Sequence, residues 1–140
     1  MKTFIDIEGR LMDVEGFLSR ARTIVTIGKA SEEAYNVVPL QDEEADVFQC
    51  QLTQSDDGWK VQNGQWRTEC PKGIRSRLQH ACSLCMGCCV NVRPAHPTYS
   101  WRMPEKPTLL NGVPLMAEAQ TLQDGDVITA GKTHIKVVVK

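Results

Sequence analysis

The clearest alternation of inward- and outward-facing positions lies near the end of the chain, between residues 108 and 139. Ile135, Val137 and Val139 recur at every second residue, the period of a strand that buries one face. Their β-branched side chains also suit a pleated sheet. We expect His134, which lies between such positions, to face solvent. The sequence therefore predicts a strand that closes the fold.

Two turn signals precede this strand. Asn111-Gly112 stands between short apolar runs, and this pair favours the positive φ angles of a tight hairpin. Asp124-Gly125 repeats the same chemistry further along the chain. Together with the closing strand, these turns predict a β meander.

The first part of the chain also contains runs that favour strands. Residues 3–7 and 22–27 are rich in β-branched and aromatic side chains, and each is short enough for a single strand. Between them, residues 13–21 have apolar side chains whose spacing fits either a strand or a helical turn. Of these two interpretations we favour the strand.

A further hairpin is predicted over residues 58–69. The pair Asn63-Gly64 divides this segment into two short runs, as expected for a tight turn between paired strands. Trp59, Val61 and Trp66 are its candidate core or sheet-face residues.

Length and composition limit the number of domains. The chain has 140 residues, a mass of 15.6 kDa and 41% hydrophobic residues, which suits one domain over residues 1–140. The apolar runs are too short to span a bilayer, and the first ten residues lack the apolar region of a secretory signal. We therefore expect an all-β, two-sheet sandwich in the cytoplasm, without membrane contact.

Charge is distributed unevenly along the chain. The net charge is -1, yet residues 70–104 contain no Asp or Glu. The basic residues of this segment are Lys72, Arg75, Arg77, Arg93 and Arg102. A basic segment in an otherwise acidic chain is consistent with an anionic partner, including nucleic acid. It is also consistent with a surface loop whose charges only keep it solvated.

The same segment, residues 70–104, contains most of the cysteines and is predicted to be an insertion within the domain. Its cysteines are Cys70, Cys82, Cys85, Cys88 and Cys89. Two Cys-x-x-Cys pairs overlap at Cys85, and this spacing lets one turn present two thiolates to a tetrahedral metal ion. In a chain without signs of secretion, clustered cysteines favour metal over disulfides. We predict one zinc ion bound by Cys70, Cys82, Cys85 and Cys88.

Several alternatives to this ligand set remain. Cys89 is an alternative to Cys88, and His80 or His96 offers an imidazole nitrogen in place of a thiolate. Free or disulfide-bonded thiols are a second interpretation. An iron–sulfur cluster is a rarer one, since the usual spacing of the fourth cysteine is absent.

Two stretches resemble the forkhead-associated (FHA) domain family. The first is the string Asn-Gly-x-x-Leu at residues 111–115, followed by Leu-x-Asp-Gly-Asp-x-Ile-x-x-Gly at 122–131 and an apolar closing strand. The second is the pattern formed by Asn36, Val38, Leu40 and Asp42. This resemblance covers most of the chain and implies a β sandwich whose loops bind phosphothreonine peptides.

The residues at the positions that bind phosphothreonine in FHA domains differ here. The family's Gly-Arg is Gly28-Lys29, its serine is Asp46, its histidine is Gln49 and its loop asparagine is Lys106. Lysine lacks the forked geometry of arginine, and a carboxylate repels a phosphate that carries nearly two negative charges. The candidate partner-binding residues are Gly28, Lys29, Ser31, Asp46, Gln49, Lys106 and Asn111.

These observations predict a non-catalytic protein-interaction module that binds a protein or peptide without a strict need for phosphothreonine. The alternative is a metal-centred element, carried on the sandwich, that binds nucleic acid or does redox chemistry. No phosphate-binding glycine loop, nucleophile elbow or His-Glu-x-x-His motif occurs in the sequence, so we do not expect catalysis.

Overall fold

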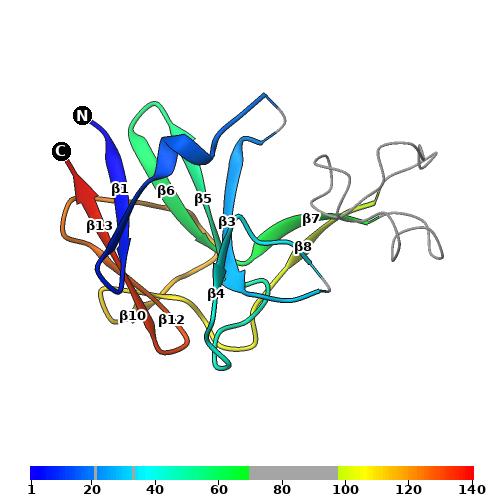
Figure 1. Cartoon of the computed structure of the whole chain (residues 1–140). Coiled ribbons are helices and arrows are strands. Elements are labelled where there is room, and N and C mark those ends of the chain that lie inside the picture. Colours follow the sequence, from blue (N-terminus) through cyan, green and yellow to red (C-terminus); the bar gives the residue numbers. More distant parts are fainter. Residues whose placement is uncertain (21, 33, 70–97) are drawn as a thin grey trace.

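Strands account for almost all of the regular structure in the computed structural model, which describes residues 1–20, 22–32, 34–69 and 98–140 (Figure 1). Within these ranges, a six-stranded sheet has the order β10-β9-β12-β13-β1-β2. Its strands are β1 (Thr3–Ile7), β2 (Arg10–Asp13), β9 (Leu109–Leu110), β10 (Val113–Pro114), β12 (Val127–Ala130) and β13 (Thr133–Val139).

A second sheet packs against the first, and a separate ribbon extends from one end of the fold (Figure 1). In the described residues the second sheet has five strands in the order β11-β6-β5-β3-β4. They are β3 (Ile24–Lys29), β4 (Val38–Leu40), β5 (Cys50–Ser55), β6 (Gly58–Asn63) and β11 (Gln120–Thr121). The ribbon pairs β7 (Gln65–Glu69) with β8 (Thr98–Arg102). The predicted all-β sandwich is thus confirmed.

Branched side chains from both sheets fill the core between them. The fully buried ones are Ile5, Ile128, Ile135 and Val137 from the first sheet and Val25, Ile27, Leu52 and Val61 from the second. In β13, Ile135 and Val137 are buried, whereas His134 and Lys136 are exposed. The alternation predicted for the closing strand is therefore confirmed.

The predicted hairpin at Asn111-Gly112 is also confirmed. Both residues have positive φ, 53° and 81°, and β9 pairs with β10 across them. Asn and Gly tolerate this left-handed conformation better than other residues, so the pair forms a turn whose twist matches that of the two strands.

The prediction of a hairpin at Asn63-Gly64 is wrong. Strand β6 pairs with β5 and β11, whereas β7 pairs with β8, so the chain turns a corner here instead of folding back. Gly64 has φ 92°, and its N–H donates to the carbonyl of Gln49 at 3.0 Å. A Cβ at Gly64 would lie 2.6 Å from the Arg102 carbonyl oxygen, so the close approach of β8 fixes the corner.

The Asp124-Gly125 turn likewise joins strands of different sheets. It follows β11 of the second sheet and precedes β12 of the first. Gly125 has φ 90°, and the Asp124 carboxylate accepts a hydrogen bond from the Val139 N–H at 2.9 Å. Asp124 and Gly125 form the turn that the sequence predicts, but tertiary contacts determine which strands this turn connects.

The strand favoured for residues 13–21 is also wrong. A short 3₁₀ helix, η1 (Val14–Phe17), begins this segment, and strand β2 ends just before it. The Asp13 carboxylate caps the helix by accepting a hydrogen bond from the Glu15 N–H at 3.1 Å. No helix among the described residues is long and apolar enough to cross a membrane.

The ribbon flanks most of the predicted insertion on both sides in the sequence. Its last registered pair is Glu69 with Thr98, the two described residues that flank residues 70–97. Residues 98–102, placed within the insertion by the sequence, form β8. The predicted zinc ligands Cys70, Cys82, Cys85 and Cys88, and the alternative ligand Cys89, lie outside the described residues.

Candidate functional site

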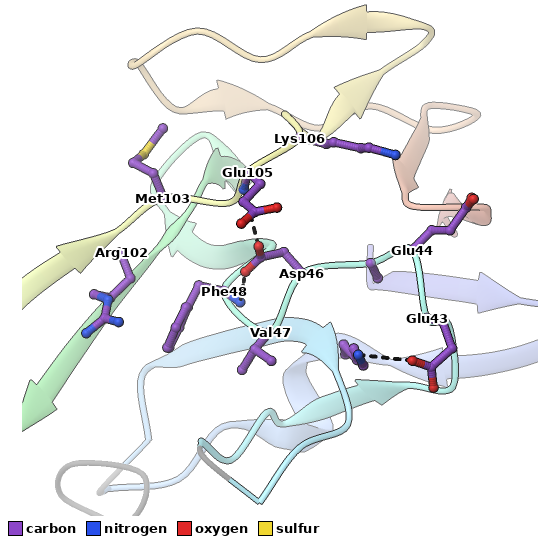
Figure 2. Close-up of a pocket in the computed structure, with 11 residues that line it drawn as sticks. Glu43, Glu44, Asp46, Val47, Phe48, Arg102, Met103, Glu105 and Lys106 are labelled. Atoms are coloured by element: carbon purple, nitrogen blue, oxygen red, sulfur yellow. Dashed lines mark hydrogen bonds and ion pairs between the residues drawn. The ribbon is translucent and has the colours of Figure 1, made fainter.

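A pocket of about 620 Å³ forms where the β4–β5 loop meets the segment between β8 and β9 (Figure 2). Charged residues of both signs line it: Lys29, Arg102 and Lys106, with Glu43, Glu44, Asp46 and Glu105. Its apolar lining includes Val47, Phe48 and Met103. Three residues predicted from separate parts of the sequence, Lys29, Asp46 and Lys106, therefore lie around one cavity.

Gly28 allows the β4–β5 loop to cross the end of β3. A Cβ at this position would lie only 2.2 Å from the Val47 carbonyl oxygen. The Lys29 N–H donates to the Asp46 carbonyl at 2.9 Å, and the Asn36 side-chain amide donates to the Val47 carbonyl at 2.8 Å. Any side chain larger than hydrogen would push the loop away from these two donors.

The Asp46 carboxylate links the two segments that form the pocket. One oxygen accepts a hydrogen bond from the Phe48 N–H at 2.8 Å, and the other accepts one from the Glu105 N–H at 3.2 Å (Figure 2). A carboxylate accepts backbone N–H groups well because its charge strengthens each bond. Asp46 is therefore an internal anion that already satisfies two backbone donors.

Gln49 is buried next to the pocket and is only 1% exposed. Its side-chain oxygen accepts a hydrogen bond from the Asp46 N–H at 2.9 Å. Its side-chain nitrogen donates to the Lys106 carbonyl at 3.2 Å and to the Thr108 hydroxyl at 2.8 Å. The structure thus gives Gln49 the geometry of a positioning residue that holds the two segments together.

Lys29 already has a partner within the pocket. Its ammonium nitrogen lies 3.1 Å from a Glu43 carboxylate oxygen, and 34% of the lysine side chain is exposed. An ion pair this accessible to solvent contributes little to stability, but it reduces the positive charge that a ligand would meet.

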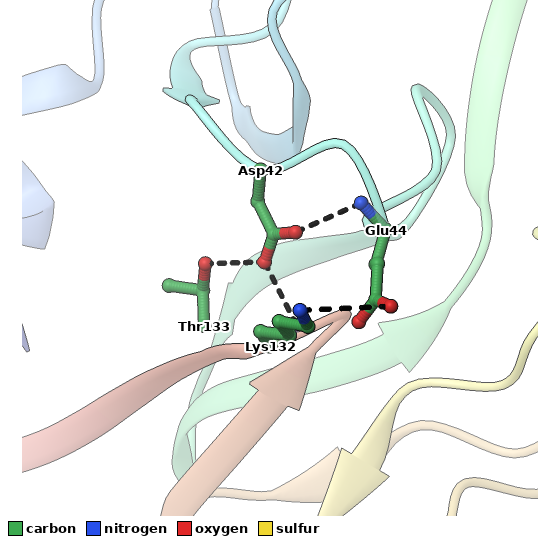
Figure 3. Close-up of polar contacts among 4 residues, drawn as sticks. All are labelled: Asp42, Glu44, Lys132 and Thr133. Atoms are coloured by element: carbon green, nitrogen blue, oxygen red, sulfur yellow. Dashed lines mark hydrogen bonds and ion pairs between the residues drawn. The ribbon is translucent and has the colours of Figure 1, made fainter.

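A separate cluster anchors the acidic end of the loop to the β12–β13 turn (Figure 3). One Asp42 oxygen accepts hydrogen bonds from the Thr133 hydroxyl at 2.7 Å and the Lys132 N–H at 2.8 Å. The Thr133 hydrogen bond is the main cause that lowers the pKa of Asp42. The Lys132 ammonium nitrogen also lies 3.9 Å from a Glu44 carboxylate oxygen. Both the backbone and the side chain of Lys132 therefore contact the loop.

Phe48 is contacted by two arginines of the ribbon. The guanidinium carbons of Arg102 and Arg67 lie 4.6 Å and 5.4 Å from the centre of its ring. Arg67 is only 6% exposed, and burial, with the nearby charge of Arg102 as a second cause, lowers its pKa to about 10. The sequence analysis did not identify Arg67 or Phe48, because no local motif marks an inward-facing arginine in a strand.

Neutral acceptors surround the buried guanidinium of Arg67. It donates to the Tyr35 carbonyl at 2.7 Å, to the Asn36 side-chain oxygen at 3.2 Å and to the Gln65 side-chain oxygen. Gln65 in turn donates to Asn36 and to the backbone of β3 and β5. These bonds fix the ribbon against the second sheet beside the pocket.

Two other predicted binding residues lie apart from the pocket lining. Asn111 donates to the Asp126 carboxylate at 3.0 Å and accepts from the Val127 N–H at 2.9 Å, so it stabilises its own turn. Ser31 follows β3 without lining the pocket. Among the described residues, no group of three or more His, Cys, Asp and Glu side chains is placed to hold a metal ion.

Comparison with solved structures identifies the type of fold. An FHA domain from a structural and functional analysis of phosphothreonine-dependent FHA domain interactions has a TM-score of 0.54 and 14% identity, covering 100% of this chain and 98% of that chain. The FHA domain of an Arabidopsis thaliana hypothetical protein has a TM-score of 0.55 and 17% identity, covering 98% of this chain and 84% of its own.

A third similar structure is the FhaA FHA domain complexed with the intracellular domain of Rv3910. It has a TM-score of 0.51 and 14% identity, covering 96% of this chain and 98% of that chain. No protein-family model and no curated protein matches the sequence. These likenesses show that the chain has an FHA-like fold, as the resemblance of its sequence motifs implied.

Proposed function

We propose that this protein is a non-catalytic interaction module whose pocket binds a segment of a partner protein without requiring phosphothreonine. The FHA-like fold supports the first part, since similar structures include phosphothreonine-dependent domains and one in complex with another protein's intracellular domain. The bridging carboxylate of Asp46 is the observation that carries the second part.

A phosphate placed in this pocket would meet an anion that cannot easily move away. Two backbone N–H groups hold the Asp46 carboxylate, and rotating it away from the pocket would break these hydrogen bonds. A phosphothreonine carries about 1.5 to 2 negative charges near neutral pH, so the two groups repel at short range.

The basic residues of the pocket offset the repulsion between Asp46 and a phosphate only in part. Lys29 is paired with Glu43 and presents a point charge in place of the fork that grips two phosphate oxygens. Lys106 stands where the resemblance implies an amide, so it lacks the acceptor that would orient a peptide backbone. Both substitutions favour a ligand with less charge than a phosphate.

The described lining supports binding better than catalysis. It provides amines, a guanidinium group and carboxylates, but among its described residues there is no serine, cysteine or histidine to act as a nucleophile or general base. Val47, Phe48 and Met103 add apolar surface that suits a peptide side chain.

The proposal is tested by blocking the pocket. We would select unphosphorylated peptides that bind the full chain from a random displayed library, and then measure their affinity for Val47→Arg. Val47 lines the pocket, so the larger charged side chain should abolish binding. Val113→Arg is the matched control, because Val113 is 64% exposed on β10 and does not line the pocket.

Peptides that bind Val47→Arg as well as the original chain would place recognition elsewhere and contradict the proposal. Thermal melting of both variants should accompany the titrations, so that loss of binding is separated from loss of folding.

We also propose that a structural zinc ion is held by Cys70, Cys82, Cys85 and Cys88. Its support is the spacing of these cysteines in a segment poor in apolar residues. A structural zinc site would contribute folding energy to a segment with little core of its own.

A further inference from the structure

We propose that the exposed face of the β7–β8 ribbon binds a proline-rich segment of a partner protein, with Trp66 as the central contact. This surface is distinct from the pocket described above, although Met103 belongs to both. Two features carry the proposal: the reversed polarity of the ribbon, and a hydrogen-bond donor on Trp66 that has no partner among the described residues.

The two faces of the ribbon have reversed polarity. In β7, Gln65 and Arg67 are 0% and 6% exposed, whereas Trp66 between them is 50% exposed. Neighbouring side chains of a strand point to opposite faces, and an antiparallel strand that packs on a core normally buries its apolar side chains. Here the buried Gln65 donates to the backbone of β3 and β5 instead. The aromatic side chain is therefore left to solvent.

The exposed face, here named the aromatic face, consists of Trp66, Trp101 and Met103. The two tryptophans are directly paired across the ribbon, with ring centres 5.3 Å apart and ring planes at 77°. The Trp101 indole N–H donates to the Met103 sulfur at 2.8 Å, and Met103 is 54% exposed. Tryptophan and methionine are enriched in protein interfaces, so an exposed patch of this composition indicates a docking surface.

The side chains of the aromatic face carry no charge. Arg102 is paired with Gln65 and therefore lies on the opposite face of the ribbon, where it and Arg67 contact the ring of Phe48. A phosphorylated, acidic or basic segment would find no opposite charge on Trp66, Trp101 or Met103. The ligand that complements these side chains is uncharged and largely apolar.

Trp66 also has a polar group available for a ligand. Its backbone N–H donates to the Gln51 side-chain oxygen at 3.1 Å, but none of the described residues accepts a hydrogen bond from its indole N–H. The Trp101 indole, in contrast, is already bonded to Met103. A ligand that covers Trp66 must accept this hydrogen bond, since a donor buried without a partner costs free energy.

A proline-rich segment meets both requirements. In the polyproline II conformation the backbone has no internal hydrogen bonds, so its carbonyl groups are free to accept one from the indole. In an α-helix most carbonyl groups are already bonded. Pyrrolidine rings are uncharged and pack on aromatic surfaces, and the two steeply inclined indoles provide two such surfaces. Proline also fixes φ before binding, which lowers the entropy cost of ordering the segment.

A nuclear magnetic resonance titration of the full chain tests the proposal. The probe is decaproline, and a glycine–serine peptide of the same length is the control ligand. The indole N–H signal of Trp66, assigned by its absence from Trp66→Phe, should shift with decaproline and not with the control. The indole signal of Trp59, which is 3% exposed, should not respond. An unchanged Trp66 signal, or an equal shift with the control peptide, would overturn the proposal.

Variants of the chain separate the aromatic ring from its donor. Trp66→Phe keeps an aromatic ring but removes the N–H, and it should weaken decaproline binding about fivefold, the scale of one hydrogen bond. Trp66→Ala removes both and should weaken binding at least about tenfold. Leu11→Ala is the control, because Leu11 is 45% exposed on β2. Thermal melting checks folding, and a folded Trp66→Phe that binds as well as the original chain would overturn the proposal.

Other occupants of the aromatic face would give different results. A larger shift of the Trp66 signal with oligo-dT than with decaproline would assign the face to single-stranded nucleic acid. Sedimentation of the original chain as a dimer and of Trp66→Ala as a monomer would assign it to a second copy. Slow exchange of the Trp66 indole N–H with water in the free monomer would show that the chain itself covers this face. Each of these results would overturn the proposal.

The pocket and the aromatic face can fail separately. Val47→Arg should leave decaproline binding intact, because Val47 lines the pocket and does not belong to the aromatic face. Loss of decaproline binding in folded Val47→Arg would place the proline-rich segment in the pocket, which overturns this inference and leaves the proposed function standing. Failure to find any peptide that depends on Val47, with decaproline still bound at Trp66, would overturn the proposed function alone.

Discussion

Gln49 and Thr108 are joined by two hydrogen bonds although they lie 59 positions apart in the sequence. The Gln49 side-chain nitrogen donates to the Thr108 hydroxyl at 2.8 Å, and that hydroxyl donates to the Gln49 carbonyl at 2.8 Å. Both groups are buried, so neither has water as a substitute partner. This contact holds the start of β5 against the segment before β9 and thereby shapes the pocket.

The first prediction concerns this contact. Gln49→Leu keeps a similar volume but leaves the Asp46 N–H and the Thr108 hydroxyl without side-chain partners, so it should lower the free energy of unfolding by about 2 kcal/mol or more. Gln54→Leu is the control, because the exposed Gln54 side chain donates to Glu15 at the surface, and its loss should change stability by less than about 0.5 kcal/mol. Urea denaturation measures both, and equal losses would contradict the prediction.

The second prediction concerns Gly28. A Cβ here would lie 2.2 Å from the Val47 carbonyl oxygen, which is backbone and cannot rotate away. Gly28→Ala should therefore destabilise the protein by about 2–3 kcal/mol, the usual cost of overpacking. It should also weaken peptide binding by displacing the loop.

Gly16→Ala is a suitable control for Gly28→Ala. A Cβ at Gly16 would meet only the Asp13 Cβ, at an ordinary contact distance of 3.8 Å. Denaturant melts that show the same stability for both variants would mean that the loop accommodates a methyl group at residue 28.

The third prediction concerns acid stability. Hydrogen bonds, first that from Thr133, lower the pKa of Asp42 below its ordinary value of 3.8. The stabilisation that this carboxylate provides is therefore present above about pH 4 and is lost as the pH falls through its lowered pKa. Asp42→Asn should have a lower free energy of unfolding than the original chain at neutral pH, and this difference in free energy should become smaller in acid.

Urea denaturation over a pH series measures this difference. Asp57→Asn, at an exposed turn residue, serves as the control and should differ little from the original chain at any pH. A deficit of Asp42→Asn that stays constant from neutral pH to below pH 4 would show that the carboxylate charge is not what stabilises the cluster.

The fourth prediction is that phosphothreonine peptides bind no better than their unphosphorylated forms. Asp46→Asn should raise the ratio of phosphorylated to unphosphorylated affinity, because it removes the repelling charge. A degenerate phosphothreonine library provides the measurement. The prediction is contradicted if the original chain enriches phosphothreonine peptides from this library and the enrichment is lost both on dephosphorylation of the peptides and on Lys29→Ala. That result would show that Lys29, Lys106 and Ser31 form an anion pocket despite Asp46.

The fifth prediction is that one zinc ion binds per chain. Cys88→Ser should lower the zinc content, whereas Cys89→Ser should retain it. Elemental analysis of gently purified protein provides the measurement. Metal-free protein in which all the cysteines of the insertion titrate freely would contradict the zinc site.

Cys50 gives an internal reference for that thiol titration. It is fully buried, and burial raises the pKa of its thiol to about 12. The native protein should therefore leave Cys50 unreactive whether or not zinc is present, and denaturation should expose it.

Local sequence determined several elements of this fold directly. Asn111-Gly112 forms its hairpin because both residues accept positive φ, a property that no distant contact is needed to create. The period-two pattern in β13 likewise defines which face is buried, since a strand alternates its side chains whatever it packs against.

Other features depended on partners that are distant in sequence. Asn63-Gly64 has the same local chemistry as Asn111-Gly112, yet it forms a corner because β8 and Gln49 approach it from elsewhere in the chain. Local preference determines that a turn occurs, whereas the pairing of strands determines what the turn connects.

The candidate site divides in the same way. The resemblance to FHA domains gave Lys29, Asp46 and Lys106 as candidate binding residues. Only the tertiary structure decided that Asp46 bridges two segments and that Gln49 is buried beside them. It also buried Arg67, with its guanidinium carbon 5.4 Å from the centre of the Phe48 ring. A buried polar side chain avoids a large free-energy cost only when it has hydrogen-bond partners. For Arg67 and Gln49 those partners come from segments far apart in the sequence, so local sequence does not predict them.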